Sequence, residues 1–382
     1  MSGNEHLGCW PLSRVAVVGA GGFMGTTLLK IISKVPDCEA VAVIRYPRSL
    51  PLVLGLSESV VATEGRTDLL ADALSTCDAV IDVSVGPASE IPTSALQLAQ
   101  SCQKAGVKRL VYTSSASAQS VKRSPYSLNR PPTYYGRQKL RAEETLLGRS
   151  METELAVIRP GLIWGPRSSW TIRHVTEIAG AAVVAPSSDS KDASAPNLAF
   201  SENLASKMLG WALSEALGGS YYFADPWWSS WEDYFLSLAA TLEISPSNVV
   251  VARKLRSGPP SRLLFEFLSN HPEVARRSKT AFTSLPEQAV DGIKAILRPP
   301  TPPPVPRPQT LMVSNSSRPT VVDTGRFTPT DIDVLCRWAE PTPQLDDGPC
   351  PLQVDKEQAL QTTASWLSSS GHLDHLGIGL HR

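Results

Sequence analysis

The stretch VAVVGAGGFMG, residues 15–25, decides the fold of this 382-residue chain. Apolar residues run directly into three glycines spaced by three, Gly19, Gly22 and Gly25, and the following TTLLKII has the pattern of a helix. A strand, a glycine turn and a helix in this order place backbone N–H groups and the positive end of the helix where a pyrophosphate binds. We therefore expect a dinucleotide to lie against this turn, with Phe23 and Met24 contributing to its site. The alternative interpretation is a glycine turn with a purely structural role, which has the same spacing.

The alternation of apolar and amphipathic segments continues well beyond the glycine turn. Between Val15 and about Gly165, the apolar runs EAVAVIR, DAVIDVSV, RLVYTS and ELAVIRPG are separated by amphipathic segments. Strands that alternate with helices indicate parallel βαβ units, and nearly continuous apolar strands are typical of a sheet covered on both faces. The sequence therefore predicts an α/β fold with an open, doubly wound parallel sheet.

The pattern loosens beyond Pro166 and then returns, so we expect two interleaved lobes. The predicted parts are an N-terminal tail over 1–13, a dinucleotide-binding domain over 14–166 plus about 197–225, and a smaller C-terminal substrate lobe over 167–196 plus about 226–382. Within that lobe, RPPTPPPVPRP at 298–308 is predicted to be an extended linker, because proline lacks a backbone donor and restricts its neighbour. A ligand for a signalling domain is the alternative.

The charge balance and the cysteines restrict the classes of partner. Lys plus Arg and Asp plus Glu both number 36, so the basic surface of a nucleic-acid or anionic-membrane binder is not expected. Six scattered cysteines without a C-x-x-C pair favour a reducing compartment, and the histidines, His174 among them, are expected on the surface or in loops. No stretch approaches the roughly 18 apolar residues of a membrane span. We expect a cytoplasmic protein with a small-molecule partner, no membrane contact and no metal.

Two arginines bear on the choice of dinucleotide. In VAVIRYPRS, about twenty residues beyond the glycine turn, Arg45 takes the place where an acidic residue would hold a ribose 2′-hydroxyl, and Arg48 follows closely. An arginine fork suits a 2′-phosphate, so we predict NADP in preference to NAD; two solvated surface arginines are the alternative. Asp68 and Leu69 follow a predicted third strand, a position suited to an adenine edge, although a helix N-cap explains Asp68 equally well.

The stretch PPTYYGRQKLRAEE carries the candidate catalytic residues. Tyr135 and Lys139 stand four apart, so on a helix both side chains project from one face. A phenol beside an ammonium group has its ionised form stabilised and serves as a proton donor or acceptor for a carbonyl or hydroxyl. Tyr134 pairs at the same spacing only with the uncharged Gln138. The alternative interpretation is a surface Tyr/Lys pair without a catalytic role, which has the same spacing.

Two further strand ends complete the pattern. GVKRLVYTSSASA ends a predicted strand with Ser114 and Ser115, and VIRPGLIWGP closes another with an R-P-G turn. The glycine loop, the strand-end serine, the Tyr/Lys pair and this turn, in this order, resemble the extended short-chain dehydrogenase/reductase family, the NAD(P)-dependent epimerase/dehydratase group. The resemblance extends from about Val15 to Asp225, and the fold that it implies is an NAD(P)-binding Rossmann fold.

The resemblance implies a role for each of these residues. Tyr135 would be the general acid/base, while Lys139 would hold the nicotinamide ribose and lower the pKa of the tyrosine. Ser115 would hydrogen-bond the reacting oxygen, with Ser114 as the alternative. The turn would shape the nicotinamide pocket through two residues, Pro160 and Gly161.

Later segments resemble one branch of the family, the 3β-hydroxysteroid dehydrogenase/isomerase-like branch. These are GGSYYFADPWWSSWEDYFLSLAATL at 218–242 and the predicted closing helix ALQTTASWL at 359–367. The aromatic residues of the first segment either line an apolar pocket or anchor the core of the second lobe. They are Trp227, Trp228, Trp231, Tyr234 and Phe235.

These observations predict an NADP(H)-dependent oxidoreductase that interconverts a ketone and a secondary alcohol on a bulky apolar molecule of steroid, terpenoid or polyketide type. The alternatives are a sugar-nucleotide epimerase that holds NAD tightly and a non-catalytic NADP-sensing regulator. The resemblance also implies a homodimer built from two helices, TSALQLAQSCQKAG and YYGRQKLRAEETLLG.

Overall fold

The structure of the chain is a computed structural model. It describes residues 13–119, 133–149, 152–180, 184–186, 195–214, 219–252, 272, 320–322, 353–376 and 378. The predicted linker at 298–308 lies outside the described residues, as does nearly all of the predicted N-terminal tail. The described chain divides into two compact units, and each is considered by itself.

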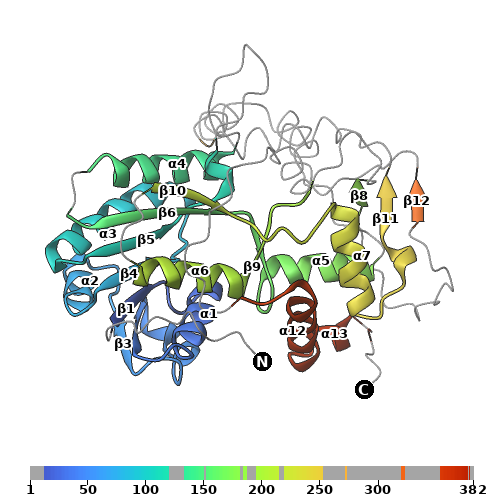
Figure 1. Cartoon of the computed structure of the whole chain (residues 1–382), viewed down its shortest axis with the longest axis horizontal. Helices are drawn as coiled ribbons and strands as arrows, with labels where there is room; N and C mark the ends of the chain where they lie inside the picture. The colour runs from blue at the N-terminus through green and yellow to red at the C-terminus, as the bar shows by residue number, and fades with distance from the viewer. Residues whose placement is uncertain are drawn as a thin grey trace, which may run out of the picture. The chain divides into compact units, whose positions relative to one another are not determined.

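The first unit is built on a seven-stranded parallel sheet (Figure 1). Its strands, in spatial order, are β10 (Gly219–Phe223), β6 (Glu154–Pro160), β5 (Arg109–Thr113), β4 (Ala79–Asp82), β1 (Ser13–Val18), β2 (Cys38–Ile44) and β3 (Ser59–Ala62). Every neighbouring pair is parallel. The strand order reverses between β1 and β4, and open α/β sheets bind ligands at such a switch point. The predicted α/β Rossmann fold is confirmed.

Two layers of helices bury both faces of this sheet. One core cluster joins the sheet to α1 (Phe23–Ile32) and α6 (Ser201–Leu213), which lie side by side in Figure 1. The opposite cluster joins it to α2 (Thr67–Leu74), α3 (Ile91–Ala105) and α4 (Tyr134–Leu147). Alternate residues of β1 enter opposite clusters, Val15 and Val17 the first and Ala16 the second. The run of apolar residues in the sequence follows from this burial on both faces.

The chain leaves and re-enters the first unit several times. This unit comprises residues 1–168, 198–225 and 342–355. A two-stranded parallel sheet joins β7 (Leu162–Trp164) to β9 (Leu198–Phe200). Further along, Asn203 donates from Nδ2 to the Val354 carbonyl at 3.1 Å and accepts the Val354 N–H at 2.9 Å. One buried amide side chain therefore fixes a segment that is about 150 residues away in sequence.

The second unit contains four described helices and a small sheet. The helices are α5 (Ser169–Ala179), α7 (Trp231–Thr241), α12 (Lys356–Ser369) and α13 (His372–His375). The strands β12 (Thr320–Val322), β11 (Val250–Ala252) and β8 (Val184–Pro186) pair in parallel. Short 3₁₀ turns complete the two units at Pro47–Leu52, Ala88–Glu90, Ala116–Ala118 and Pro246–Asn248.

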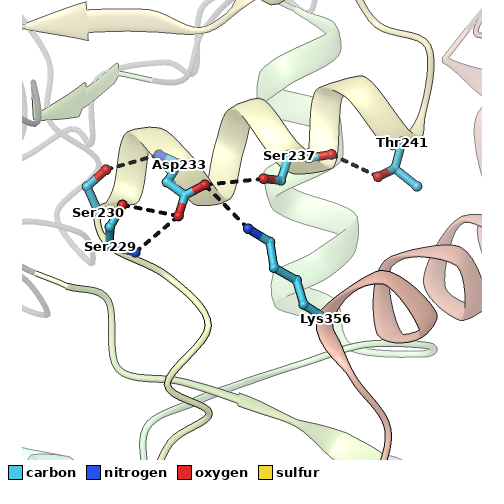
Figure 2. A network of polar contacts seen from close by, with 6 residues as sticks. All are labelled: Ser229, Ser230, Asp233, Ser237, Thr241 and Lys356. Carbon is cyan, nitrogen blue, oxygen red and sulfur yellow. Dashed lines mark hydrogen bonds and ion pairs between the residues drawn. The ribbon is translucent and has the colours of Figure 1, made fainter.

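A polar network fixes the start of α7 and links it to α12 (Figure 2). Ser230 caps the helix by accepting the Asp233 N–H at 3.1 Å, and the Asp233 carboxylate accepts from the N–H and hydroxyl of Ser229. Lys356 at the start of α12 reaches the same carboxylate at 3.5 Å, and its ammonium lies 4.4 Å from the Trp228 ring centroid. Serine caps and acidic first-turn residues stabilise helix N-termini, so α7 is anchored by its own sequence.

The aromatic residues of the second unit form its core. Trp231, Tyr234 and Phe235 are at most 1% exposed, as the interpretation of these residues as a core requires. Trp231 stacks on Phe235, and Tyr234 meets Trp231 edge-on and Phe235 at a tilt. His174 lies among them with its Nδ1 3.1 Å from the Tyr234 hydroxyl, so its expected surface or loop position is wrong. Burial lowers the pKa of His174 to about 3, which keeps the ring neutral at physiological pH.

Asp225, at the end of the segment that follows β10, gives a prediction about stability. Its carboxylate accepts the Phe200 N–H at 2.5 Å and the Asn203 Nδ2 at 2.8 Å, yet burial raises its pKa to about 6. The folded state then binds the proton more tightly than the unfolded chain does. The contribution of Asp225 to the free energy of unfolding should therefore fall by about 2–3 kcal/mol as pH rises from about 4 to 6. Urea titrations of wild type and Asp225→Asn between pH 4.5 and 7 test this. The wild-type free energy of unfolding minus that of the variant should fall across the range, and a constant difference would contradict it.

Candidate active site

The glycine turn connects β1 to α1 at the switch point of the sheet. Gly19 has a φ of +87°, and a Cβ there would lie 2.8 Å from the Ser84 backbone beyond β4. A Cβ on Gly25 would fall on the Gly19 carbonyl oxygen. Both glycines are thus required by close approaches of the protein's own backbone, whatever binds against the turn. Gly22 is the N-cap of α1 and has no side chain to cap it, which leaves the first turn open to an anion.

The residues predicted to select the dinucleotide lie beyond the ends of β2 and β3. Arg45 and Arg48 flank the ring of Tyr46, with guanidinium-to-centroid distances of 5.5 and 4.8 Å. The Arg45 Nη1 also lies 3.8 Å from the Glu90 carboxylate, and both side chains are half exposed. Glu90 therefore competes with any phosphate for Arg45, a feature that the sequence analysis missed because Glu90 is 45 residues away.

Asp68 and Leu69 lie within α2 rather than at the strand end. The N-cap of α2 is Arg66, and the exposed Asp68 carboxylate pairs with the Arg66 guanidinium at 2.5 Å. The residues directly beyond β3 are Thr63 to Arg66, with Gly65 at a φ of +77°. The N-cap interpretation of Asp68 is wrong by two positions, and its predicted contact with adenine remains a prediction.

Lys139 and Tyr135 lie on the face of α4 that packs against the sheet. Lys139 is 3% exposed, and its Nζ donates to the Thr113 carbonyl at the end of β5 at 2.8 Å. The ammonium lies 6.0 Å from the Tyr135 ring centroid and 5.1 Å from that of Tyr112. The two residues thus share one helix face beside the carboxyl edge of the sheet, as their spacing predicts.

Burial dominates the electrostatics of this pair. Burial raises the pKa of Tyr135 to about 12, in contrast to the lowering that the family resemblance implies. Burial also lowers the pKa of Lys139, while the carboxylates of Asp82 and Glu143 act in the opposite direction. The pKa of Asp82 is itself raised by burial at the end of β4. A phenol that keeps its proton is suited to donating it to a developing alkoxide.

The structure distinguishes the two candidate serines. Ser114 is buried, and its hydroxyl donates to the Glu143 carboxylate, so this hydroxyl already has a partner inside the protein. Ser115 is partly exposed at the start of the next turn, where its Oγ lies 2.8 Å from the Ser117 Oγ and accepts the Ser117 N–H. The arrangement favours Ser115 as the hydroxyl available to a reacting oxygen.

A buried ion pair that sequence reasoning missed supports the whole arrangement. Glu143 accepts from Nε and Nη2 of Arg159 on β6, with the Nη2 contact at 2.5 Å, and Arg159 Nη1 donates to the Tyr222 hydroxyl of β10 at 2.7 Å. Burial disfavours the guanidinium charge, but the hydrogen bond and charge of Glu143 raise the pKa of Arg159 above its usual value. The available signal was spacing, because Glu143 follows Lys139 by four residues.

Three backbone positions complete the site. A Cβ on Gly136 would fall on the Ser117 carbonyl oxygen, so glycine beside Tyr135 allows α4 to approach the turn that carries Ser115. Pro160 ends β6 opposite Phe223, and the Gly161 N–H donates to the Phe223 carbonyl at 3.0 Å. Since β5 and β6 are parallel neighbours, these residues lie at the same sheet edge as Ser115.

The described architecture is a Rossmann fold, the fold typical of NAD(P)-binding domains. Residues 19–173 match the model of the NAD(P)H-binding family, which covers the glycine turn, the Tyr/Lys pair and the R-P-G turn. The sequence has no significant match among curated proteins.

Solved structures share the architecture at low sequence identity. The Bordetella bronchiseptica enzyme WbmG in complex with NAD matches with a TM-score of 0.56 and 14% identity over 97% of this chain and 98% of its own. UDP-N-acetylglucosamine 4-epimerase from Methanobrevibacter ruminantium M1 matches with a TM-score of 0.55 and 14% identity, over 94% of this chain and 99% of its own. MoeE5 in complex with UDP-glucose and NAD matches with a TM-score of 0.51 and 16% identity, again over 94% of this chain and 99% of its own. These likenesses confirm the fold.

Among the described residues, none of the helices combines the length and the apolar character of a membrane span. The same part of the chain contains no group of three or more His, Cys, Asp or Glu side chains placed to hold a metal ion.

The buried ion pair predicts a large effect of one substitution. Glu143→Gln should lower the free energy of unfolding by up to about 3–5 kcal/mol, because it leaves the partly buried Arg159 charge without its partner. Asp68→Asn, which breaks the exposed pair with Arg66, is the matched control and should leave the unfolding midpoint nearly unchanged. Chemical denaturation of the three proteins at pH 7 measures both effects. Equal midpoints for the two variants would contradict the structural role of Glu143.

Proposed function

We propose that the chain is an NAD(P)-dependent enzyme of the extended short-chain dehydrogenase/reductase type. The observation that carries the proposal is the placement of Tyr135 and Lys139 on one buried helix face, beside the strand end that bears Ser115. The cofactor would supply hydride transfer, with its pyrophosphate held at the open start of α1. Tyr135 would move the proton of the reacting hydroxyl, Ser115 would hold that oxygen, and Lys139 would hold the nicotinamide ribose.

For the substrate, we propose the hydroxyl-bearing sugar of a sugar nucleotide, with epimerisation as the reaction. Two structural neighbours with a TM-score above 0.5 support this choice, since one is a UDP-N-acetylglucosamine 4-epimerase and another was solved with UDP-glucose. A bulky apolar substrate is less well supported, because Trp231, Tyr234 and Phe235 fill the core of the second unit instead of lining a pocket for it. The steroid-like branch therefore has no structural support in the described residues.

A second candidate is the net interconversion of a ketone and a secondary alcohol with free NADP(H). Arg45 and Arg48 favour it, because two guanidinium groups beyond β2 suit the 2′-phosphate of the cofactor that reductases consume. A regulator that only senses NADP would need neither Tyr135 nor Lys139, and the chain has both.

The two reactions differ in what happens to the cofactor. An epimerase reoxidises its own intermediate, so UDP-hexose should be converted to its epimer without a change in absorbance at 340 nm, and denatured protein should release a bound dinucleotide. A reductase should consume NADPH when a ketone is added. If neither activity appears across UDP-sugars and ketones, while NAD or NADP binds, the enzymatic proposal is refuted in favour of the sensor.

We also propose a homodimer formed through α3 and α4, which lie side by side on one face of the sheet. Leu147 on α4 is half exposed, as expected of a residue that a partner helix covers. The predicted cytoplasmic location stays a prediction.

The catalytic proposal predicts distinct effects for the two residues of the pair. Tyr135→Phe keeps the ring and its packing but removes the transferable proton, so turnover should fall by about 10²–10⁴ while cofactor affinity and melting temperature stay nearly unchanged. Lys139→Met should reduce both turnover and cofactor affinity, since its ammonium serves the ribose as well as the phenol. Steady-state kinetics and calorimetric titration measure the two effects. Undiminished turnover in Tyr135→Phe would refute the catalytic assignment.

The cofactor preference makes a separate prediction. NADP should bind more tightly than NAD, and Arg45→Ala should remove most of the difference by deleting a charge-assisted contact worth about 1.5–3 kcal/mol. Glu90→Gln should act in the opposite direction, because it frees Arg45 from the carboxylate 3.8 Å away. Calorimetry on the three proteins tests this, and equal affinities of wild type for NAD and NADP would contradict the predicted preference for NADP.

A further inference from the structure

A cavity of about 190 Å³ lies in the first unit, and none of the residues Ser115, Tyr135 and Lys139 is among those that line it. Lys30 and Lys34 of α1 contribute to its wall, as do Arg167 beyond β7 and the first residues of α6, Ser201 and Glu202. Three cations thus surround one carboxylate, which leaves the cavity with an excess of positive charge.

Among the described residues, no carboxylate lies within ion-pair distance of Lys30, Lys34 or Arg167. Lys30 and Lys34 are exposed and keep their hydration, so Arg167 is the cation of this wall whose position matters most. Arg167 is only partly exposed, so its charge is partly removed from water without being neutralised. An anion in the cavity would remove this deficit.

The position of Arg167 is fixed by the chain around it. Its φ is +69°, a left-handed conformation that a residue with a side chain adopts only when its surroundings impose it. Its Nη1 donates to the Thr26 hydroxyl at 2.7 Å, and that hydroxyl is held by the carbonyls of Gly22 and Phe23. The guanidinium is therefore preorganised beside α1 before any ligand arrives.

A hydroxyl group without a partner lies in the same wall. Ser201 is 1% exposed, and its Oγ has no hydrogen-bond partner in the described part of the chain. It begins α6, whose N-terminus already has two carboxylates beside it, Glu202 in the first turn and Asp225, which accepts the Phe200 N–H, so the group left unsatisfied here is the Ser201 hydroxyl itself. Buried polar groups are normally satisfied, and an acceptor from a ligand would satisfy this one.

We propose that this cavity, the α1–Arg167 pocket lined by Lys30, Lys34, Arg167 and Ser201, binds the phosphate group of a small phosphorylated molecule. A dianionic phosphate offers several acceptors to the guanidinium, the ammonium groups and the hydroxyl at once. The pocket extends along α1 from Thr26 to Lys34, and Lys30 follows Gly22 by eight helical residues, so the ammonium groups lie about 12 Å or more along the helix from the predicted pyrophosphate position. The inference needs no catalytic activity and stands apart from the proposed function.

The test uses the full chain with saturating NADP, so that the open start of α1 is already occupied. Inorganic phosphate should raise the melting temperature more than sodium chloride of equal ionic strength, and calorimetry should give a saturable isotherm. Arg167→Gln keeps a donor for the Thr26 hydroxyl but loses the charge, and Lys30→Gln loses an exposed charge with little effect on folding. Each should weaken phosphate binding at least roughly tenfold. Lys104→Gln on α3 is the matched control and should bind as wild type does.

A second arm identifies the form of the ligand. Glucose 6-phosphate and inorganic phosphate are titrated separately, and tighter binding of the sugar phosphate assigns the pocket to phosphorylated metabolites, while tighter binding of inorganic phosphate assigns it to the free ion. Equal responses to phosphate and chloride in wild type would overturn the proposal, as would unchanged phosphate binding in both Arg167→Gln and Lys30→Gln. Because no substrate is used, failure here leaves the catalytic proposal untouched.

Discussion

Glu143 and Arg159 form a buried ion pair that joins α4 to the sheet, and the geometry of the candidate active site follows from it. The same carboxylate accepts the Ser114 hydroxyl at the end of β5, while Arg159 continues to Tyr222 on β10. Three neighbouring strands and one helix are thus tied at a single point. Because a buried charge without its partner is costly, the pair selects one position of α4 over its neighbours.

That position brings two further residues of the same helix face to the sheet edge. Tyr135 and Lys139 precede Glu143 by eight and four residues, so the contact that fixes Glu143 also directs the catalytic pair. Lys139 is held by the Thr113 carbonyl, and burial opposes its charge while two carboxylates support it. In such surroundings a bound cofactor changes the electrostatics strongly, since charges interact more strongly where water is excluded.

The sequence predicted what local patterns encode, and it failed where distant residues meet. The glycine turn and the apolar strands specify the sheet directly, and the spacing of Tyr135 and Lys139 specifies a shared helix face. Adjacent residues such as Ser114 and Ser115 have nearly equal sequence signals, and only the contact with Glu143 separates them. The burial of the second unit's aromatic residues likewise depends on packing between α5 and α7, which no short pattern encodes.

The most direct measurement of the central claim is a crystal structure of the chain with its nicotinamide dinucleotide. The account predicts the pyrophosphate at the N–H groups that open α1, and the nicotinamide ribose within hydrogen-bond distance of the Lys139 ammonium and the Tyr135 hydroxyl, with the ion pair of Glu143 intact. A dinucleotide bound elsewhere would contradict it. So would a nicotinamide ring far from Tyr135 while Lys139 still donates only to the Thr113 carbonyl.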